Sequence, residues 1–192
     1  MTRMESLKNK NVLITGATGG IGSKTVQLLA GSGAHLFLAA RNAEKLAEVA
    51  AQHNIPAEQT LALDLSKPEE VAVLREKFFN RFGTIDVLVN AAGVGIIKQM
   101  ETLTEIDYNL YAPFLLVKAF LPAMKEQKKG LIINIPGVLG KVPMAGAAAY
   151  SASKYGLVGM MQSIREEVKR TEIRITNLFL GGADTPFWDT ID

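Results

Sequence analysis

Cysteine is absent from the 192-residue sequence. Its absence excludes a disulfide framework, a thiolate nucleophile and a zinc site with cysteine ligands. None of the motifs described below calls for a metal ion of another kind. Because a chain without disulfides suits a reducing compartment, we expect the protein to be cytoplasmic.

Long apolar runs are also missing. A membrane-spanning helix needs ~20 apolar residues in succession, and the best candidate is interrupted by Pro113, Lys118 and Pro122. The first ten residues are polar and charged, and the run Val12–Ile14 is too short for the core of a signal peptide. We therefore expect a soluble protein with no membrane partner.

The sequence has no marked surplus of one charge sign. Lysine and arginine number 21 against 19 aspartate and glutamate residues, which gives a net charge of +2. A nucleic-acid-binding domain normally carries a clear basic surplus, so no nucleic-acid partner is expected. With 48% hydrophobic and 21% charged residues, the composition is globular, and 192 residues suffice for one core but hardly for two.

Short runs of valine, isoleucine and leucine alternate with longer segments of helical spacing. This alternation predicts parallel strands joined by helices. The expected strands are Asn11–Thr15, His35–Ala40, Thr60–Asp64, Asp86–Asn90, Leu131–Ile135 and Ile173–Phe179. The expected helices are Gly20–Ala30, Ala43–His53, Pro68–Phe82, Ile106–Gln127 and Ala149–Lys169.

This pattern predicts the α/β class: a Rossmann-like, doubly wound parallel sheet with helices on both faces, in a single domain over residues 1–192. Ligands of such sheets bind beyond the carboxyl ends of the strands. The segments Leu110–Leu121 and Ala147–Ile164 are apolar around much of their circumference. Either they lie deep within the monomer or they cover another subunit, and we expect a homodimer or homotetramer.

A glycine-rich turn, TGATGGIG, follows the first expected strand and opens the first expected helix. Glycines allow a tight turn and a close backbone approach to a pyrophosphate, while free amides at the helix start bind its oxygens. Such turns also occur for purely structural reasons. The residues expected to contact a dinucleotide here are Gly16, Thr18, Gly20, Ile21 and Gly22.

The residues after the second strand indicate which dinucleotide binds. NAD sites usually hold the adenosine ribose with an acid at this place, but this chain has Ala40 and Arg41. Arginine pairs with a ribose 2′-phosphate through a planar fork. We therefore expect NADP(H) rather than NAD(H), unless Arg41 is an ordinary exposed cation. Asp64 could accept a hydrogen bond from the adenine amino group or could cap its strand.

Tyr150 and Lys154 are four residues apart at the start of an expected helix, so both side chains lie on one face. Together with other motifs, this pair makes the sequence resemble the NADP-preferring branch of the short-chain dehydrogenase/reductase family over nearly its whole length. The motifs, in order, are Thr15–Gly22, Asp64-Leu65, Asn90-Ala91-Ala92-Gly93, Asn109, Tyr150 with Lys154, and Thr185.

The resemblance implies a role for each matching residue. Tyr150 would be the general acid/base, Lys154 would hold the nicotinamide ribose and assist Tyr150, and Asn109 would support a water-linked proton relay. The implied cofactor site also includes Asp64 and Leu65, Asn90 as a brace of the central strands, Gly93 as a point of close approach, and Thr185 at the nicotinamide carboxamide.

The reaction of such enzymes explains these residue types. Hydride transfer to a carbonyl carbon leaves negative charge on the oxygen, and a proton must arrive there. The phenol of Tyr150 can supply it, but moving its pKa from ~10 to near neutral needs ~4 kcal/mol of phenolate stabilisation. The Lys154 ammonium and the positive charge of the nicotinamide could provide much of this. In the competing interpretation, Tyr150 is a packed core tyrosine and Lys154 a solvated helix residue.

The family's catalytic serine is replaced by glycine. Alignment backward from Tyr150 and forward from Asn109 puts its place at Gly137. If its loss resembles removal of an oxyanion-hole donor, the barrier rises by ~2.7–4 kcal/mol, or ~10²–10³ in rate. Ser151 and Ser153 point in other directions from the helix than Tyr150 and are not expected to replace it.

Three other departures concern the loops and the C-terminus. Leu180 stands where the family has proline, and the segment between Gly93 and Asn109 is a few residues short. The chain stops soon after Thr185. We therefore expect the family's usual C-terminal helix and edge strand to be lacking.

Two functions fit this sequence. The leading one is an NADP(H)-dependent oxidoreductase that interconverts a carbonyl and an alcohol, with Tyr150 as general acid/base. The alternative is a catalytically weakened dinucleotide-binding or subunit-interaction protein that retains the fold, and Gly137 favours it. An apolar substrate is suggested by residues on the expected carboxyl-end loops, namely Ile96, Ile97, Met144, Phe187 and Trp188.

Overall fold

The computed structural model describes residues 7–94, 106–183 and 185. Within them one parallel sheet contains six strands in the order β3-β2-β1-β4-β5-β6. The strands are β1 (Asn11–Thr15), β2 (His35–Ala40), β3 (Thr60–Ala62), β4 (Val87–Asn90), β5 (Lys129–Asn134) and β6 (Glu172–Asn177). Because the strand order reverses between β1 and β4, a crevice forms at their carboxyl ends. The expected doubly wound α/β fold is confirmed.

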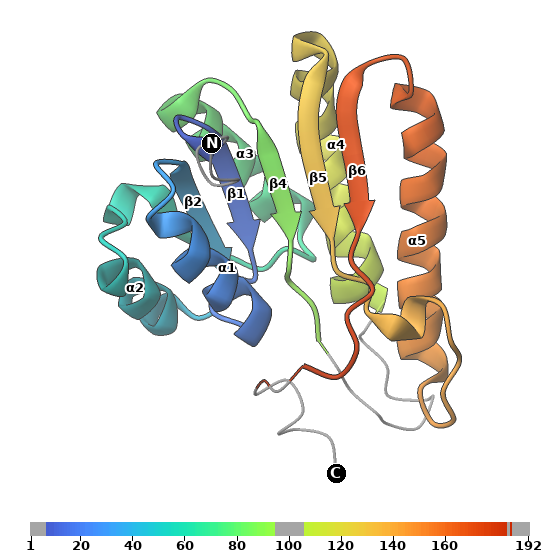
Figure 1. Cartoon of the computed structure of the whole chain (residues 1–192). Helices are drawn as coiled ribbons and strands as arrows, with labels where there is room; N and C mark the ends of the chain where they lie inside the picture. Colours follow the sequence, from blue (N-terminus) through green and yellow to red (C-terminus); the bar gives the residue numbers. More distant parts are fainter. Residues whose placement is uncertain (1–6, 95–105, 184, 186–192) are drawn as a thin grey trace.

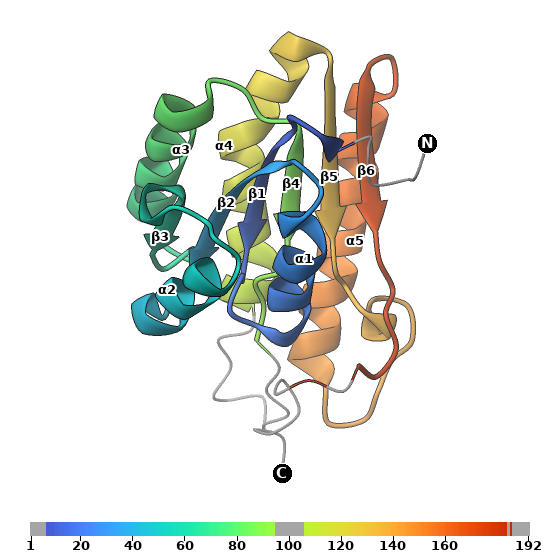
Figure 2. The ribbon, with the colours of Figure 1, turned by 60° about the vertical axis from the view of Figure 1, so that its left-hand side comes forward.

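Helices cover the sheet from both sides (Figures 1 and 2). On one face lie α1 (Gly20–Ala30) and α2 (Ala43–Gln52), and on the other lie α3 (Pro68–Phe82), α4 (Ala112–Gln127) and α5 (Ala148–Val168). Three short turns join them: η2 (Ala57–Gln59), the π-helical turn η4 (Asp107–Tyr111) and η5 (Val138–Gly140). None of the helices in the described ranges is long and apolar enough to cross a membrane.

Each face of the sheet has its own apolar core. In β1, Leu13 packs with the α3–α5 side, whereas Val12 and Ile14 pack with the α1–α2 side. This explains why successive residues of the strand are apolar. On the α3–α5 side, Phe78 contacts Phe120 edge to face, with ring centroids 5.6 Å apart.

The structure corrects some of the expected element bounds. Strand β3 ends at Ala62 instead of Asp64, because the Asp64 amide donates to Glu70 Oε2 at 2.6 Å and leaves the ladder. The expected helix Ile106–Gln127 begins with the π-helical turn, and regular α-helix starts only at Ala112. Strands β1 and β2 and helices α1 and α3 have the expected bounds.

Polar side chains link the carboxyl ends of the central strands. In register, Asn90 of β4 faces Asn134 of β5, which faces Asn177 of β6. Asn90 Nδ2 donates to Asn134 Oδ1 at 2.8 Å, and Asn134 Nδ2 donates to Asn177 Oδ1 at 3.1 Å. On the other side, Thr15 Oγ1 donates to the Val89 carbonyl. These bonds fix the strand ends that frame the crevice, and they show Asn90 bracing the central strands.

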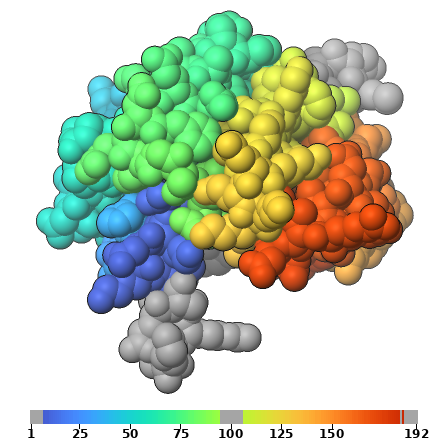
Figure 3. All heavy atoms as spheres, turned by 90° about the horizontal axis from the view of Figure 1, so that it is seen from above, coloured from blue at the N-terminus to red at the C-terminus, as the bar shows by residue number. Residues whose placement is uncertain are grey.

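The opposite end of the sheet is built differently. Seen from above in Figure 3, it is covered by the connections that lead into β4, β5 and β6. The carboxyl ends of the strands lie at the lower end of the sheet, where the chain leaves β1, β4, β5 and β6 in succession (Figure 1).

We expect Asn134→Ala to lower the free energy of unfolding by about 1–3 kcal/mol, since it leaves the buried Asn90 amide without its acceptor. Asn177→Ala is the matched control, because Asn177 is only half-buried and its loss affects one bond at the end of the chain of asparagines. The Asn177→Ala variant should lose about half as much free energy of unfolding as Asn134→Ala. Urea unfolding measures both, and equal losses would contradict the bracing role of the central amide.

Candidate functional site

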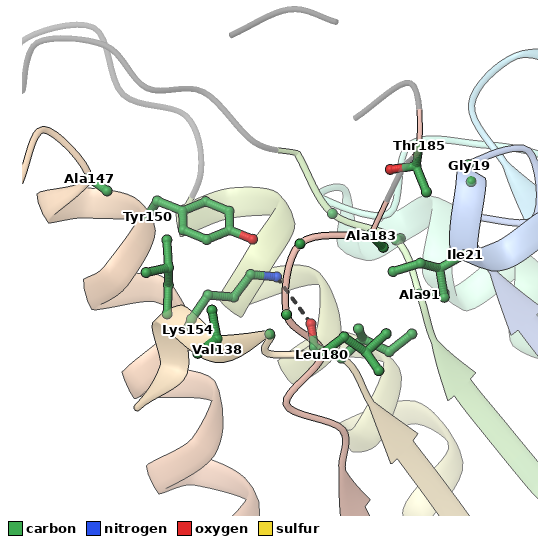
Figure 4. A pocket seen from close by; sticks show the side chains of 18 of the residues that line it. Gly19, Ile21, Ala91, Val138, Ala147, Tyr150, Lys154, Leu180, Ala183 and Thr185 are labelled. Atoms are coloured by element: carbon green, nitrogen blue, oxygen red, sulfur yellow. Dashed lines mark hydrogen bonds between the residues drawn. The ribbon is translucent and has the colours of Figure 1, made fainter. Parts of the chain in front are cut away.

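The carboxyl ends of the strands open onto a cavity of about 510 Å³. Its lining comes from the glycine turn after β1, from the loops after β4, β5 and β6, and from the first turns of α5. In Figure 4, Tyr150 and Lys154 reach in from α5, opposite Gly19 and Ile21 of the glycine turn. Segments far apart in the sequence therefore form one site.

The glycine turn packs so closely that side chains are excluded. Gly16 has φ of +68°, and a Cβ there would lie 2.5 Å from the Ala92 nitrogen. A Cβ on Gly22 would overlap the Gly16 carbonyl oxygen. Gly20 lies directly beneath Thr185, because a Cβ at this glycine would be 2.5 Å from the threonine Cβ. The turn thus presents bare backbone to the cavity.

The start of α1 fits an anionic ligand. Its N-cap, Gly19, has no side chain to bond the first amides, and the first turn contains no acidic residue. Helix N-termini carry unpaired N–H donors and partial positive charge, which favour phosphate oxygens. The residues present therefore fit the pyrophosphate of a dinucleotide.

Two cations flank this turn on the α2 side. Arg41 follows β2, and Lys45 lies one turn further along; both line the main cavity and an adjoining one of about 250 Å³. The sequence analysis identified Arg41 but missed Lys45. Its spacing of four residues from Arg41 was the available signal, since α2 begins at Ala43 with Asn42 as its N-cap.

Asp64 caps the chain after β3, the second of the two roles considered for it. Its Oδ1 accepts from the Ser66 amide at 3.0 Å and from Ser66 Oγ at 2.7 Å, and its Oδ2 accepts from the Tyr108 hydroxyl at 3.3 Å. Partial burial alone would raise the pKa of Asp64, but these hydrogen bonds bring it below its ordinary value. Leu65 lines the smaller cavity, whereas Asp64 does not.

Asn109 and Gly93 lie together at the centre of the site. Asn109 is 1% exposed; its Oδ1 accepts from the Val94 amide at 3.0 Å and its Nδ2 donates to the Val94 carbonyl at 2.9 Å. A Cβ on Gly93 would lie 2.9 Å from Asn109 Oδ1 and 3.6 Å from Lys154 Nζ. The Asn109 side chain therefore holds the loop after β4 in place. Because Gly93 has no side chain, this loop can pass close to Asn109 and Lys154.

Lys154 is buried, contrary to the solvated-lysine interpretation. Its residue is 6% exposed, and its Nζ donates to the Ile135 carbonyl at 3.4 Å (dashed line in Figure 4). The same nitrogen lies 5.3 Å from the centre of the Tyr150 ring. Tyr150 and Lys154 thus share one face of α5 and point into the cavity (Figure 4).

Burial controls the proton affinities of this pair. It lowers the pKa of Lys154 to about 8 and raises the pKa of Tyr150 to about 12. The sequence-based expectation of a phenol brought near neutral pH relied on the positive charge of a bound nicotinamide as well as on Lys154, so it concerns the cofactor-bound site. In the protein alone, burial therefore keeps Tyr150 protonated at neutral pH.

Gly137 has a backbone conformation that only glycine adopts readily. Its φ is +68° and its ψ is 176°, a region that costs other residues ~1–3 kcal/mol. Space is available, because a Cβ would meet only the Leu180 carbonyl oxygen, at 3.6 Å. Of the nearby serines, Ser153 Oγ donates to the Tyr150 carbonyl at 2.7 Å. Ser151 Oγ is buried with no partner among the described residues.

The other predicted site residues are divided between the cavities and the supporting structure. Those that line a cavity are Gly16, Thr18, Gly20, Ile21, Arg41, Leu65, Gly93, Tyr150, Lys154 and Thr185. Gly22, Asp64, Asn90 and Asn109 stand behind the lining. Met144 lines the main cavity, whereas Ile96, Ile97, Phe187 and Trp188 lie outside the described residues.

We expect Lys154→Met to stabilise the fold by about 1–3 kcal/mol at pH 7, because it removes a buried charge. The folded-state pKa of about 8 lies below the ordinary 10.5, so the penalty is fully present below pH 8 and disappears as the pH rises to 10.5. Urea unfolding at several pH values should show the advantage of the variant shrinking over this window.

The exposed Lys77 on α3 gives the control for that measurement. Lys77→Met removes the same charge from solvent and should leave the stability nearly unchanged at every pH. A Lys154→Met variant less stable than the wild type at pH 7 would show that the ammonium is not a net burden on the fold.

Comparisons with known proteins agree with this geometry. The family model described as short chain dehydrogenase matches residues 10–192. An uncharacterized oxidoreductase of Staphylococcus saprophyticus is 37% identical over 98% of this chain and 80% of its own length.

Two solved structures have the same arrangement of elements. A metagenomic short-chain oxidoreductase in complex with NADP is 38% identical, with a TM-score of 0.84 over 93% of this chain and 85% of its own. An alcohol dehydrogenase from the archaeon Thermococcus sibiricus, complexed with 5-hydroxy-NADP, is 30% identical, with a TM-score of 0.84 over 94% and 79%. The crevice, the glycine turn and the Tyr150–Lys154 pair thus occur in a chain that belongs to the short-chain dehydrogenase/reductase family of oxidoreductases.

Proposed function

We propose that this protein is an NADP(H)-dependent oxidoreductase that interconverts a carbonyl and an alcohol, with Tyr150 as the general acid/base. The observation that carries the proposal is the convergence of Tyr150 and the buried Lys154 on the cavity that the glycine turn lines. Two family members with similar structures are complexed with NADP or 5-hydroxy-NADP. A buried lysine that destabilises the fold is readily explained if it serves a ligand.

Different residues of the chain would bind different parts of the cofactor. The bare amides at the start of α1 would bind the pyrophosphate, and Arg41 with Lys45 would bind a 2′-phosphate. Lys154 lines the other end of the cavity, where it would hold the nicotinamide ribose, while Thr185 lies against Gly20 of the glycine turn. The absence of an acid beside Arg41 favours NADP(H) over NAD(H), because an acid there would repel the 2′-phosphate.

The bound nicotinamide would supply or accept the hydride, and Tyr150 of the protein would donate or accept the proton. In reduction, Tyr150 donates its phenolic proton to the carbonyl oxygen as negative charge develops there. The pKa of about 12 keeps the phenol protonated at neutral pH, which suits this direction. In oxidation, Tyr150 must first lose its proton, so this direction requires the positive charge of the bound cofactor or a higher pH.

Apolar side chains line the part of the cavity near Tyr150. Val138, Met144 and Leu180 are exposed large hydrophobic residues that belong to this lining. They favour a carbonyl substrate with an apolar body, since such a surface gains from being covered. We therefore propose small apolar ketones, aldehydes or the corresponding alcohols as the substrate class.

Assembly into a homodimer or homotetramer is part of the proposal. Most apolar residues of α4 are buried within the monomer, but Tyr111 and Phe114 are exposed and stack with ring centroids 5.9 Å apart. Tyr155 of α5 is also exposed. Most of the apolar surface of α4 thus lies within the monomer, and the exposed rings would be available to a second subunit.

A second candidate is a dinucleotide-binding protein of the same fold with weakened catalysis. Gly137 favours it, because the position has no hydroxyl and a backbone conformation unsuited to serine. The two candidates predict the same binding of the dinucleotide but different rates of substrate turnover.

Steady-state oxidation of NADPH with a panel of apolar ketones and aldehydes tests the leading candidate. We expect Tyr150→Phe to lower kcat by ~10²–10⁴ while NADPH binding changes less than about twofold, because only the proton donor is lost. Tyr155→Phe is the control, since this tyrosine is on the same helix but 44% exposed. Wild-type turnover in Tyr150→Phe would exclude the assigned role, and NADPH binding without turnover in the wild type would favour the second candidate.

The missing serine is tested by comparing Gly137→Ser with Gly137→Ala. Both variants introduce a Cβ into the strained conformation and should lose about 1–3 kcal/mol of stability. Only serine adds a hydroxyl, so we expect kcat of Gly137→Ser to exceed that of Gly137→Ala by at least about tenfold, with ~10²–10³ as the upper range. Equal kcat values would mean that the hydroxyl has no role in this site.

A further inference from the structure

Three chain segments meet at the smaller cavity, away from Tyr150. Arg41 comes from the loop after β2, Asp64 from the loop after β3, and Tyr108 from the π-helical turn before α4. The guanidinium carbon of Arg41 lies 4.7 Å from the centre of the Tyr108 ring. The Tyr108 hydroxyl donates to Asp64 Oδ2 at 3.3 Å. Arg41 and Tyr108 line the cavity.

Stacking on Tyr108 leaves the guanidinium able to bind a ligand. The guanidinium carbon lies over the Tyr108 ring, and within the described ranges no hydrogen bond uses the N–H donors of this side chain. None of the ion pairs among the described residues includes Arg41. Its charge is therefore held in position by Tyr108 without being neutralised.

An exposed arginine that is free to rotate loses side-chain entropy when a ligand fixes it. A contact that already restricts the side chain before binding reduces this loss. A cation–π contact with Tyr108 is attractive and can provide this restriction. Tyr108 can therefore increase the affinity of Arg41 for an anion without contacting the anion itself.

Tyr108 is itself fixed on both sides. Its hydroxyl bonds the Asp64 carboxylate, which Ser66 holds by two further hydrogen bonds. The next residue, Asn109, is anchored to Val94 by two hydrogen bonds. The bonds of Tyr108 to Asp64 and of Asn109 to Val94 hold this π-helical turn at two neighbouring residues, so the Tyr108 ring has little freedom to move away from Arg41.

We propose that Tyr108 is a positioning residue that presets Arg41 for the 2′-phosphate and thereby strengthens the preference for NADP(H). The inference rests on the proposed function, because it requires that the smaller cavity receives the adenosine end of the cofactor. A plain wall of that cavity would affect NADPH and NADH alike. A residue that acts through Arg41 affects NADPH selectively and only while Arg41 is present.

The test is a double-mutant cycle on the dissociation constants of NADPH and NADH, measured by fluorescence titration at one fixed ionic strength. The variants are Tyr108→Leu, Arg41→Ala and their combination, with Tyr108→Phe as the matched control that keeps the ring. Adenosine 2′,5′-bisphosphate and adenosine 5′-monophosphate, used as competitors, report the adenosine end alone. NADH affinity also shows whether each variant is folded.

We expect Tyr108→Leu to weaken NADPH binding by about threefold to tenfold and NADH binding by less than twofold. In the Arg41→Ala background the same change should have no further effect on NADPH, and Tyr108→Phe should keep most of the preference. The affinity for adenosine 2′,5′-bisphosphate should change across the variants as the NADPH affinity does. The affinity for adenosine 5′-monophosphate should change as the NADH affinity does.

The outcomes separate the inference from the proposed function. Equal losses for both dinucleotides, or additive effects of the two substitutions, would overturn the role of Tyr108 while leaving an NADP(H) enzyme. Arg41→Ala without effect on the preference would overturn both the role of Tyr108 and the assignment of Arg41. A wild type that binds neither dinucleotide would overturn the proposed function together with the inference.

Discussion

A lysine ammonium buried at the ends of parallel strands is the constraint on which the rest of the site depends. Within the part of the chain that the structure describes, the Ile135 carbonyl, at 3.4 Å, is the only hydrogen-bond acceptor of Lys154, and burial lowers the pKa of this lysine to about 8. The fold tolerates the cost of burying this charge because other hydrogen bonds fix the strand ends and the loop around Lys154. The asparagines at the ends of β4, β5 and β6 align the strands, and Asn109 holds the loop that passes Lys154.

The two ends of the crevice use charge in different ways. Near Tyr150, partial burial raises the pKa of the phenol, so in the protein alone it keeps its proton at neutral pH. Near α2 the cations are exposed, and their effect on a ligand depends on salt. The glycine turn connects these ends with backbone donors that need no side chain.

Much of this arrangement could be predicted from the sequence because its signals are local. The apolar runs of β1 and β2, the glycine turn and the proline at the start of α3 each determine their own stretch of chain. The four-residue spacing of Tyr150 and Lys154 similarly placed both side chains on one face of α5. Parallel strand ends then bring these separate motifs to one edge of the sheet.

The features that were missed depend on contacts between distant segments. The pairing of Asn90, Asn134 and Asn177 requires the strand register, and the stack of Tyr108 on Arg41 requires the π-helical turn to meet the loop after β2. The glycine at 137 could be identified as a missing serine, but not as a residue with positive φ. The expectation of a phenol near neutral pH included the charge of a bound nicotinamide, so it stays a prediction; in the protein alone, burial raises the pKa of Tyr150 to about 12.

The most direct measurement is a crystal structure of the protein with NADP⁺ bound. We expect the pyrophosphate at the start of α1, the 2′-phosphate beside Arg41 and Lys45, and the nicotinamide riboside within hydrogen-bond reach of Lys154, with the Tyr150 hydroxyl facing the nicotinamide. A crevice that remains empty at saturating NADP⁺, or a Tyr150 hydroxyl directed away from the bound nicotinamide, would contradict the role assigned to the buried lysine and its neighbouring phenol.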